Sequence, residues 1–116
     1  MNLAELQRLC CEHYGESFES PELDQLVAIS EGVIDSFEDI ELEGVRYHSP
    51  DHMSGWWLTT NLYTGDVSSL KTVHFRHIAE KRPEIAQYMA LPIGYRFVLG
   101  GDSEHVWFDQ KVKDDV

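Results

Sequence analysis

The sequence lacks the cysteine pattern of a disulfide-stapled protein. Its two cysteines, Cys10 and Cys11, are neighbours, so they cannot link distant parts of the chain, and a bond between them would be strained. No apolar run approaches the roughly 20 residues that span a bilayer, and the first residues lack the basic-then-apolar order of a secretory signal. These absences predict reduced thiols and a cytoplasmic protein with no membrane partner.

Local signatures of catalysis are missing as well. There is no Gly-x-Ser-x-Gly, and the Gly-Gly-Asp-Ser of residues 100–103 is not followed by the Lys-Ser/Thr of a phosphate loop, so it indicates a tight turn. The pairs His48/His52 and His74/His77 have metal-like spacing, but neither has a cysteine or a third ligand close by. We therefore expect no catalytic residue, no metal and no cofactor.

Basic residues are scarce in the first third of the chain. Residues 1–43 hold 12 acids against one base, Arg8, a net of −11 out of the −12 of the whole protein. This charge disfavours nucleic acid as a partner, because the phosphate backbone requires a basic surface. It would speed association with a basic partner through long-range attraction. The simpler alternative is a solvated surface that only keeps the protein soluble.

The length of 116 residues predicts one domain over 1–116. Leu3, Leu6, Cys10 and Tyr14 have helical spacing and predict a helix over 2–14, ended by Gly15. Strands are predicted near 26–34, after a short helical turn, and at 39–47, 55–60, 95–99 and 106–108. Helices are predicted from 68 or 69 to 78 and over 83–89. The tail 111–116 is expected to fray.

Together these elements predict an α+β fold. A single antiparallel sheet of about four to five strands would carry an N-terminal helix and loop (1–20) and a helical pair at about 69–90 packed on it. Adjacent Trp56 and Trp57 must point to opposite faces of their strand, so one fills the core. The other lies under a covering helix or at the surface, where it is a candidate contact residue.

Four short motifs resemble a family of small bacterial immunity proteins. They are Ser-Gly-Trp-Trp-Leu at 54–58, Glu-Lys-Arg-Pro-Glu-Ile at 80–85, Leu-Pro-Ile-Gly-Tyr-Arg-Phe at 91–97 and Val-Trp-Phe-Asp at 106–109, and the likeness spans about 26–112. Such proteins accompany polymorphic toxins, contact-delivered toxins or type VI effectors. The family pattern has an acid just before Ser-Gly-Trp, where this chain has Met53. The resemblance implies stoichiometric binding of a cognate toxin, an α+β fold and no cofactor.

Charge and resemblance together lead to a hypothesis for the site. An acidic strand face, joined by acids of the first helix, would be steered to a basic toxin surface and occlude it. The predicted partner-binding residues are Glu38, Asp39, Glu41, Glu43, Asp51 and Trp56. Two alternatives stay open: a small enzyme or ligand-binding domain with a pocket around His48, Asp51, His52 and Trp56, and an interaction domain unrelated to toxins.

Overall fold

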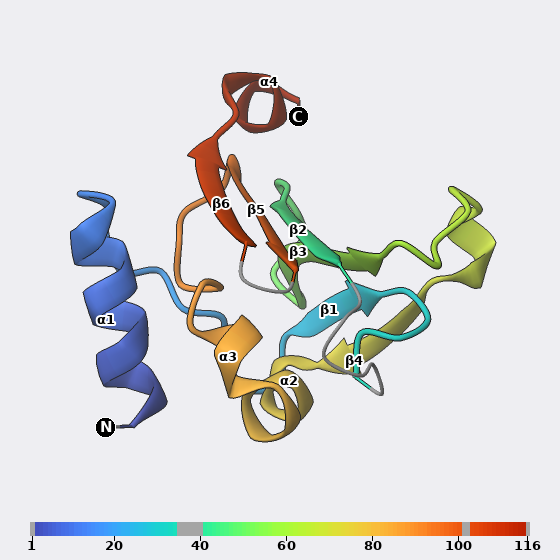
Figure 1. The fold of residues 1–116 in the computed structure, drawn as a ribbon, viewed down its shortest axis with the longest axis horizontal. Helices are drawn as coiled ribbons and strands as arrows, with labels where there is room; N and C mark the ends of the chain where they lie inside the picture. The colour runs from blue at the N-terminus through green and yellow to red at the C-terminus, as the bar shows by residue number, and fades with distance from the viewer. Residues whose placement is uncertain (1, 35–40, 101–102, 116) are drawn as a thin grey trace.

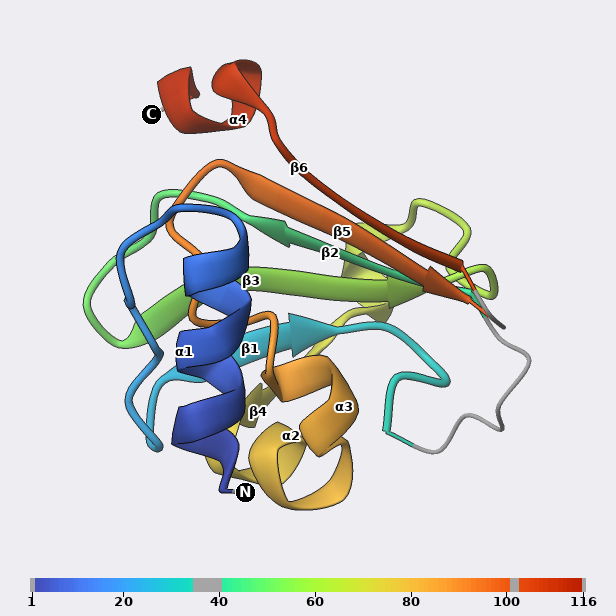
Figure 2. The ribbon, with the colours of Figure 1, turned by 60° about the vertical axis from the view of Figure 1, so that its left-hand side comes forward.

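A six-stranded sheet forms the protein, with helices from the first and middle parts of the chain on one face and the C-terminal helix beyond its edge (Figures 1 and 2). The computed structural model describes residues 2–34, 41–100 and 103–115. The elements in chain order are α1 (Leu3–His13), β1 (Leu26–Ile29), β2 (Leu42–Arg46), β3 (Met53–Thr60), the 3-10 helix η1 (Val67–Ser69), β4 (Lys71–His74), α2 (Phe75–Lys81), α3 (Pro83–Ala86), β5 (Tyr95–Gly100), β6 (Ser103–Phe108) and α4 (Gln110–Asp114).

The sheet is mixed, with strand order β4-β1-β3-β2-β5-β6. The α+β class is confirmed, but the expectation of four to five antiparallel strands is wrong. β1 runs parallel to β3, with Ala28 opposite Trp57, and antiparallel to β4. The remaining pairs, β2–β3, β2–β5 and β5–β6, are antiparallel. The error arose because β1 pairs with β3 and β4, which are not its neighbours in sequence, and a local sequence pattern does not indicate such pairing.

The predicted helical pair begins later than expected. Residues 71–74 form β4, and only from Phe75 does the chain turn helical. The β-branched Thr72 and Val73 favour a strand over a helix. In addition, the backbone of this segment forms its hydrogen bonds with β1, so it does not need a helical turn to satisfy them. Pro83 opens α3 at its first turn, as predicted, because a proline there lacks only an N–H that has no intrahelical partner.

Both ends of the chain are helical. α1 is capped by Asn2, whose side chain accepts the Glu5 N–H at 2.9 Å, and it ends before Gly15, which adopts a φ of +68°. In the tail, which was expected to fray, Gln110–Asp114 form α4. This helix is capped by Asp109 and anchored by Val112, a side chain that is 6% exposed.

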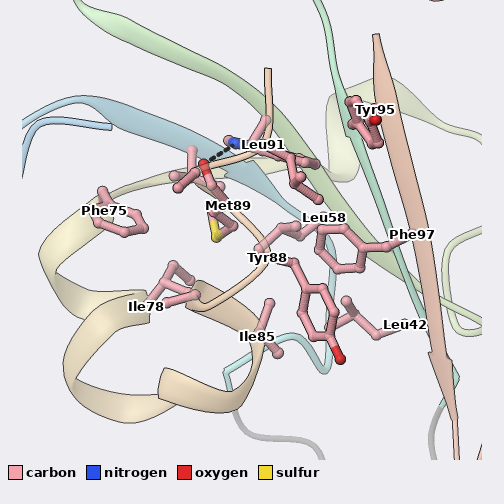
Figure 3. Packing of buried hydrophobic residues seen from close by; sticks show 14 of the residues in the cluster. Leu42, Leu58, Phe75, Ile78, Ile85, Tyr88, Met89, Leu91, Tyr95 and Phe97 are labelled. Carbon is pink, nitrogen blue, oxygen red and sulfur yellow. Dashed lines mark hydrogen bonds between the residues drawn. The ribbon is translucent and has the colours of Figure 1, made fainter. Parts of the chain in front are cut away.

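The core lies between the helices and one face of the sheet (Figure 3). Trp56 and Phe97 are fully buried there, and the Trp56 indole N–H donates to the backbone oxygen of Met89 at 2.8 Å. Tyr88 stacks on Phe97 with ring centroids 5.3 Å apart. Gly44 gives Phe97 its space, because a Cβ at that position would lie 2.4 Å from the ring.

A buried arginine joins the sheet to the segments that cover it. The guanidinium of Arg46 donates to the backbone oxygens of Ser54 (3.1 Å), Glu19 (2.6 Å) and Leu91 (2.8 Å), with a longer contact to Met89 (3.4 Å). Burial lowers its pKa to about 10, so the group is still charged at neutral pH. Arg46 therefore ties β2 to β3, to the segment after α1 and to the chain that leads into β5.

Candidate functional site

Of the acids expected to bind a partner, the structure describes Glu41, Glu43 and Asp51. Glu38 and Asp39 lie outside the described residues. Glu41 is exposed just before β2, and Asp51 is exposed in the turn between β2 and β3. Glu43 lies within β2 and is ion-paired to Arg96 of β5 at 2.5 Å. The strand pairing thus brings Glu43 together with a cation rather than with other carboxylates.

The acids of α1 lie on the other side of the sheet from Glu43. α1 packs in the helical layer, where Gln7 donates to the Ala86 backbone oxygen at 3.2 Å and Tyr14 donates to Glu104 of β6 at 3.2 Å. Glu43 alternates along β2 with Leu42 and Gly44, which face the core, and so points away from that layer. The high acid content of the first third is divided between two sides of the protein.

Trp56 is not an exposed contact residue, which corrects its place in the predicted set. Its side chain is 0% exposed and is held in the core, whereas Trp57 is 36% exposed on the opposite face of β3. The expectation that the two indoles point to opposite faces is confirmed. The indole that a partner can reach is therefore Trp57.

The alternative pocket around the histidines is not assembled. His48, Asp51 and His52 are exposed in the chain between β2 and β3, while Trp56 is in the core. A ring nitrogen of His48 hydrogen-bonds the Lys113 backbone oxygen at 2.6 Å. Two surface pockets, of about 580 and 320 Å³, are lined by none of these four residues. In the described part of the chain, no group of three or more metal-ligating side chains comes together.

Among the described residues, one face of the sheet has no helical layer, and we call the strand residues whose side chains lie on that face the open face (Figures 1 and 2). α1, α2 and α3 all lie on the other face. The strand register sets a row of residues across this side, and its members are Ala28, Trp57, Val45, Arg96 and Trp107. Trp57 and Trp107 are 36% and 40% exposed, so the row presents two indoles to solvent.

Aromatic and charged contacts organise the open face. The rings of Tyr47 and Trp57 meet edge to face with centroids 5.7 Å apart. The Arg96 guanidinium lies 5.5 Å from the centre of the Trp107 ring and binds both Glu43 and Asp109, the latter at 3.1 Å. These contacts hold Arg96 and Trp107 in defined positions before any partner arrives.

The charge of Asp109 is stabilised in this arrangement. Its hydrogen bond to Arg96, together with the Lys111 backbone N–H, lowers the pKa of the carboxyl group below its usual value. The open face therefore has the Arg96 guanidinium between the acidic groups of Glu43 and Asp109, and the two indoles lie in the same row, one to each side of Arg96. This combination of Trp, Tyr and Arg is typical of the residues that dominate protein–protein binding energies.

Sequence reasoning missed most of the open face. Trp107, Arg96 and Tyr47 were assigned to strands or motifs but to no site. The available signal was alternation: residues 95–99 and 103–108 fall in one hairpin, so Arg96 and Trp107 had to lie on one side, opposite Phe97. Alternation of side chains assigns residues to the two faces of a strand, but it does not show which face the helices cover.

The chain belongs to the Imm33-like domain family, a family of immunity proteins, because residues 6–109 match that domain. The match takes in α1 from Leu6 onward, a helix that the motifs of the sequence alone had left outside the resemblance. No curated protein and no solved structure matches the chain. Within the described residues, no helix has the length and apolar character needed to cross a membrane.

Proposed function

We propose that this protein binds and neutralises a cognate bacterial toxin as a stoichiometric inhibitor, and that the open face is its docking surface. Membership of an immunity-protein family supports the binding of a toxin. The observation that carries the choice of surface is the pair of indoles, Trp57 and Trp107, exposed on the side of the sheet opposite α1, α2 and α3. Neutralisation then needs no bond to be made or broken, only occlusion of the toxin.

The aromatic side chains would supply most of the binding energy. A large aromatic carries about 150–250 Å² of surface, and the third or more of each indole that is exposed here would leave water on docking. Arg96 is already oriented by Glu43 and Asp109, so less rotamer freedom is lost when a partner binds. The contact would therefore centre on Trp57, Arg96 and Trp107.

The acids would act mainly on the rate of association. The net charge of −12 attracts a basic surface from beyond contact distance, and Glu41, Glu43 and Asp51 are the described members of the predicted set. Glu38 and Asp39 stay in the proposal as sequence-based members. A toxin that acts on nucleic acid has a basic cleft, which would suit this field.

The docking surface is tested by truncating its indoles. Trp57→Ala and Trp107→Ala are each expected to weaken the complex at least thirtyfold, the loss typical of a binding hot spot of about 2 kcal/mol. Phe108→Ala is the matched control, because Phe108 is 39% exposed, follows Trp107 directly and points to the opposite face of β6. The readouts are titration calorimetry with the toxin encoded beside the gene, rescue of growth on co-expression, and a urea melt of each variant.

Full rescue and unchanged affinity for both folded tryptophan variants would refute the open face as the docking surface. Loss of affinity in the Phe108 variant alone would move the contact to the helical side. Turnover of a substrate by the purified protein without a partner would refute the proposed function itself.

The electrostatic part has its own test. The triple variant Glu41→Lys, Glu43→Lys, Asp51→Lys should associate more slowly and with a weaker dependence on salt. The triple variant Glu5→Lys, Glu12→Lys, Glu22→Lys makes the same change of charge at exposed positions outside the proposed set. Equal association rates for the two triple variants, measured in stopped flow at several salt concentrations, would show that only total charge matters.

A further inference from the structure

A second binding feature lies on the helical side of β6. A groove of about 320 Å³ runs between α1, the residues after α3 and β6. Its lining consists of Leu6, Leu9, Cys10, His13, Tyr14, Gln87, Tyr88 and Glu104. Leu9 is 50% exposed, so part of the apolar wall is in contact with water. The groove therefore combines an exposed apolar wall with one carboxylate.

The carboxylate of Glu104 is held by two neutral donors. Tyr14 donates to Oε1 at 3.2 Å and Tyr88 donates to Oε2 at 2.5 Å. Burial and then the interaction with Glu104 raise the pKa of Tyr14 to about 12, and the same two causes raise the pKa of Tyr88. Both phenols are thus protonated at neutral pH, and they orient the carboxylate without cancelling its charge.

Within the described residues, no basic side chain forms an ion pair with Glu104. The ion pairs there join Arg82 to Glu84 and Arg96 to Glu43 and Asp109, and Glu104 takes part in none of them. The Cys10 thiol stays protonated, because burial, then Cys11 and Glu104, raise its pKa to about 12. An oriented negative charge in a partly apolar groove is complementary to a cation on an aliphatic stem.

We propose that this groove receives an arginine side chain of a protein partner. The planar guanidinium can bind both oxygens of Glu104 at once and lie against the tyrosine rings, which an ammonium group does less well. The methylene stem would cover the apolar wall formed by Leu6 and Leu9. Glu104 and Trp107 project from opposite faces of the edge strand β6, so a partner that wraps this edge would reach both the groove and the open face.

The groove can be tested without any toxin, so its failure and that of the proposed docking surface are distinguishable. The full chain, labelled with ¹⁵N, is titrated with n-butylguanidinium at constant ionic strength, and amide shifts are followed by NMR. The neutral analogue n-butylurea has nearly the same shape and is the matched probe. We expect the guanidinium to shift the amides of residues 6–14, 87, 88 and 104, and the urea to leave them unmoved.

Two sets of variants separate charge from architecture. Glu104→Gln should weaken n-butylguanidinium binding at least tenfold, whereas Glu12→Gln, which removes the same charge from an exposed position of α1 outside the groove, should change it less than about twofold. The double variant Tyr14→Phe, Tyr88→Phe keeps the carboxylate but removes the two donors that orient it, so it should bind n-butylguanidinium more weakly than the original protein and more tightly than Glu104→Gln. The amide spectrum of each variant reports whether α1 stays in place.

The proposal is overturned by any of three results. These are equal binding of the urea, unchanged binding by a folded Glu104→Gln protein, and shifts spread evenly over the surface acids. Weak binding lost in Glu104→Gln but kept in Glu12→Gln supports it.

Discussion

Replacing Arg46 by methionine should remove a large part of the stability of the protein. The side chain is 9% exposed, and its guanidinium donates to three backbone oxygens within 3.1 Å, those of Ser54, Glu19 and Leu91. Methionine fills a similar volume but donates nothing. The oxygens of Ser54 and Leu91 would then be buried without these donors.

The expected loss follows from two opposing contributions. A hydrogen bond to a charged group is worth about 1.5–3 kcal/mol, so losing the bonds to the two buried oxygens, those of Ser54 and Leu91, removes about 3–6 kcal/mol. Burial of the guanidinium is itself unfavourable, as its pKa of about 10 shows, and methionine relieves that cost. We expect a net loss of about 3 kcal/mol in the free energy of unfolding, which corresponds to a fall of about 12 °C in Tm for a domain of this size.

Urea denaturation followed by tryptophan fluorescence measures this loss. Arg46→Lys keeps a charge but cannot reach all three oxygens from one ammonium group, so its stability should lie between the other two proteins. Arg8→Met is the control: Arg8 is exposed on α1, 4.4 Å from the centre of the Phe18 ring, and its loss should cost less than about 1 kcal/mol. A loss below about 1 kcal/mol in Arg46→Met would refute the reasoning.

Two further predictions concern packing and pH. Gly44→Ala should destabilise the protein by about 1–3 kcal/mol, because the added Cβ would overlap the Phe97 ring. In a double-mutant cycle measured by urea melts, adding Phe97→Leu should recover part of that loss. Strictly additive effects of the two substitutions would contradict the overlap. Burial, then hydrogen bonds to Glu104 or Glu16, raise the pKa values of Tyr14, Tyr88 and Tyr95 above the ordinary value of 10. The unfolded chain loses these protons first, so this part of the stability is complete below about pH 10 and lost as pH rises through the folded pKa values. Urea melts paired with tyrosinate absorbance between about pH 8 and 12 should show the decline, and a flat profile would contradict it.

Elements with strong local signals were predictable, and those that depend on distant pairing were not. The helical spacing before Gly15 located α1, and the turn glycines located the β5–β6 hairpin. β4 was mistaken for helix because Leu70, Val73 and His77 also fit a helical period in a segment this short. The parallel partnership of β1 and β3 is a tertiary choice that no window of sequence contains.

The candidate site was harder to predict for a geometric reason. Counting charge along the chain treats the first third as one surface, but the sheet puts Glu43 on one side and α1 on the other. Alternation from Leu42 through Gly44 places Arg46 on the core side, a signal that was present but runs against the usual exposure of arginine. Alternation likewise separates Trp56 from Trp57 without saying which one solvent reaches.

The sheet keeps its interior on one side and leaves the other without a helix, so the two sides can change separately over evolution. Substitutions at outward positions such as Trp57, Val98 or Trp107 leave the core between the helices and the sheet intact, so they should alter the free energy of unfolding less than substitutions within that core. A descendant of this chain can therefore acquire a new recognition specificity by replacing a few outward side chains, while Trp56, Phe97 and Arg46 preserve the architecture that displays them.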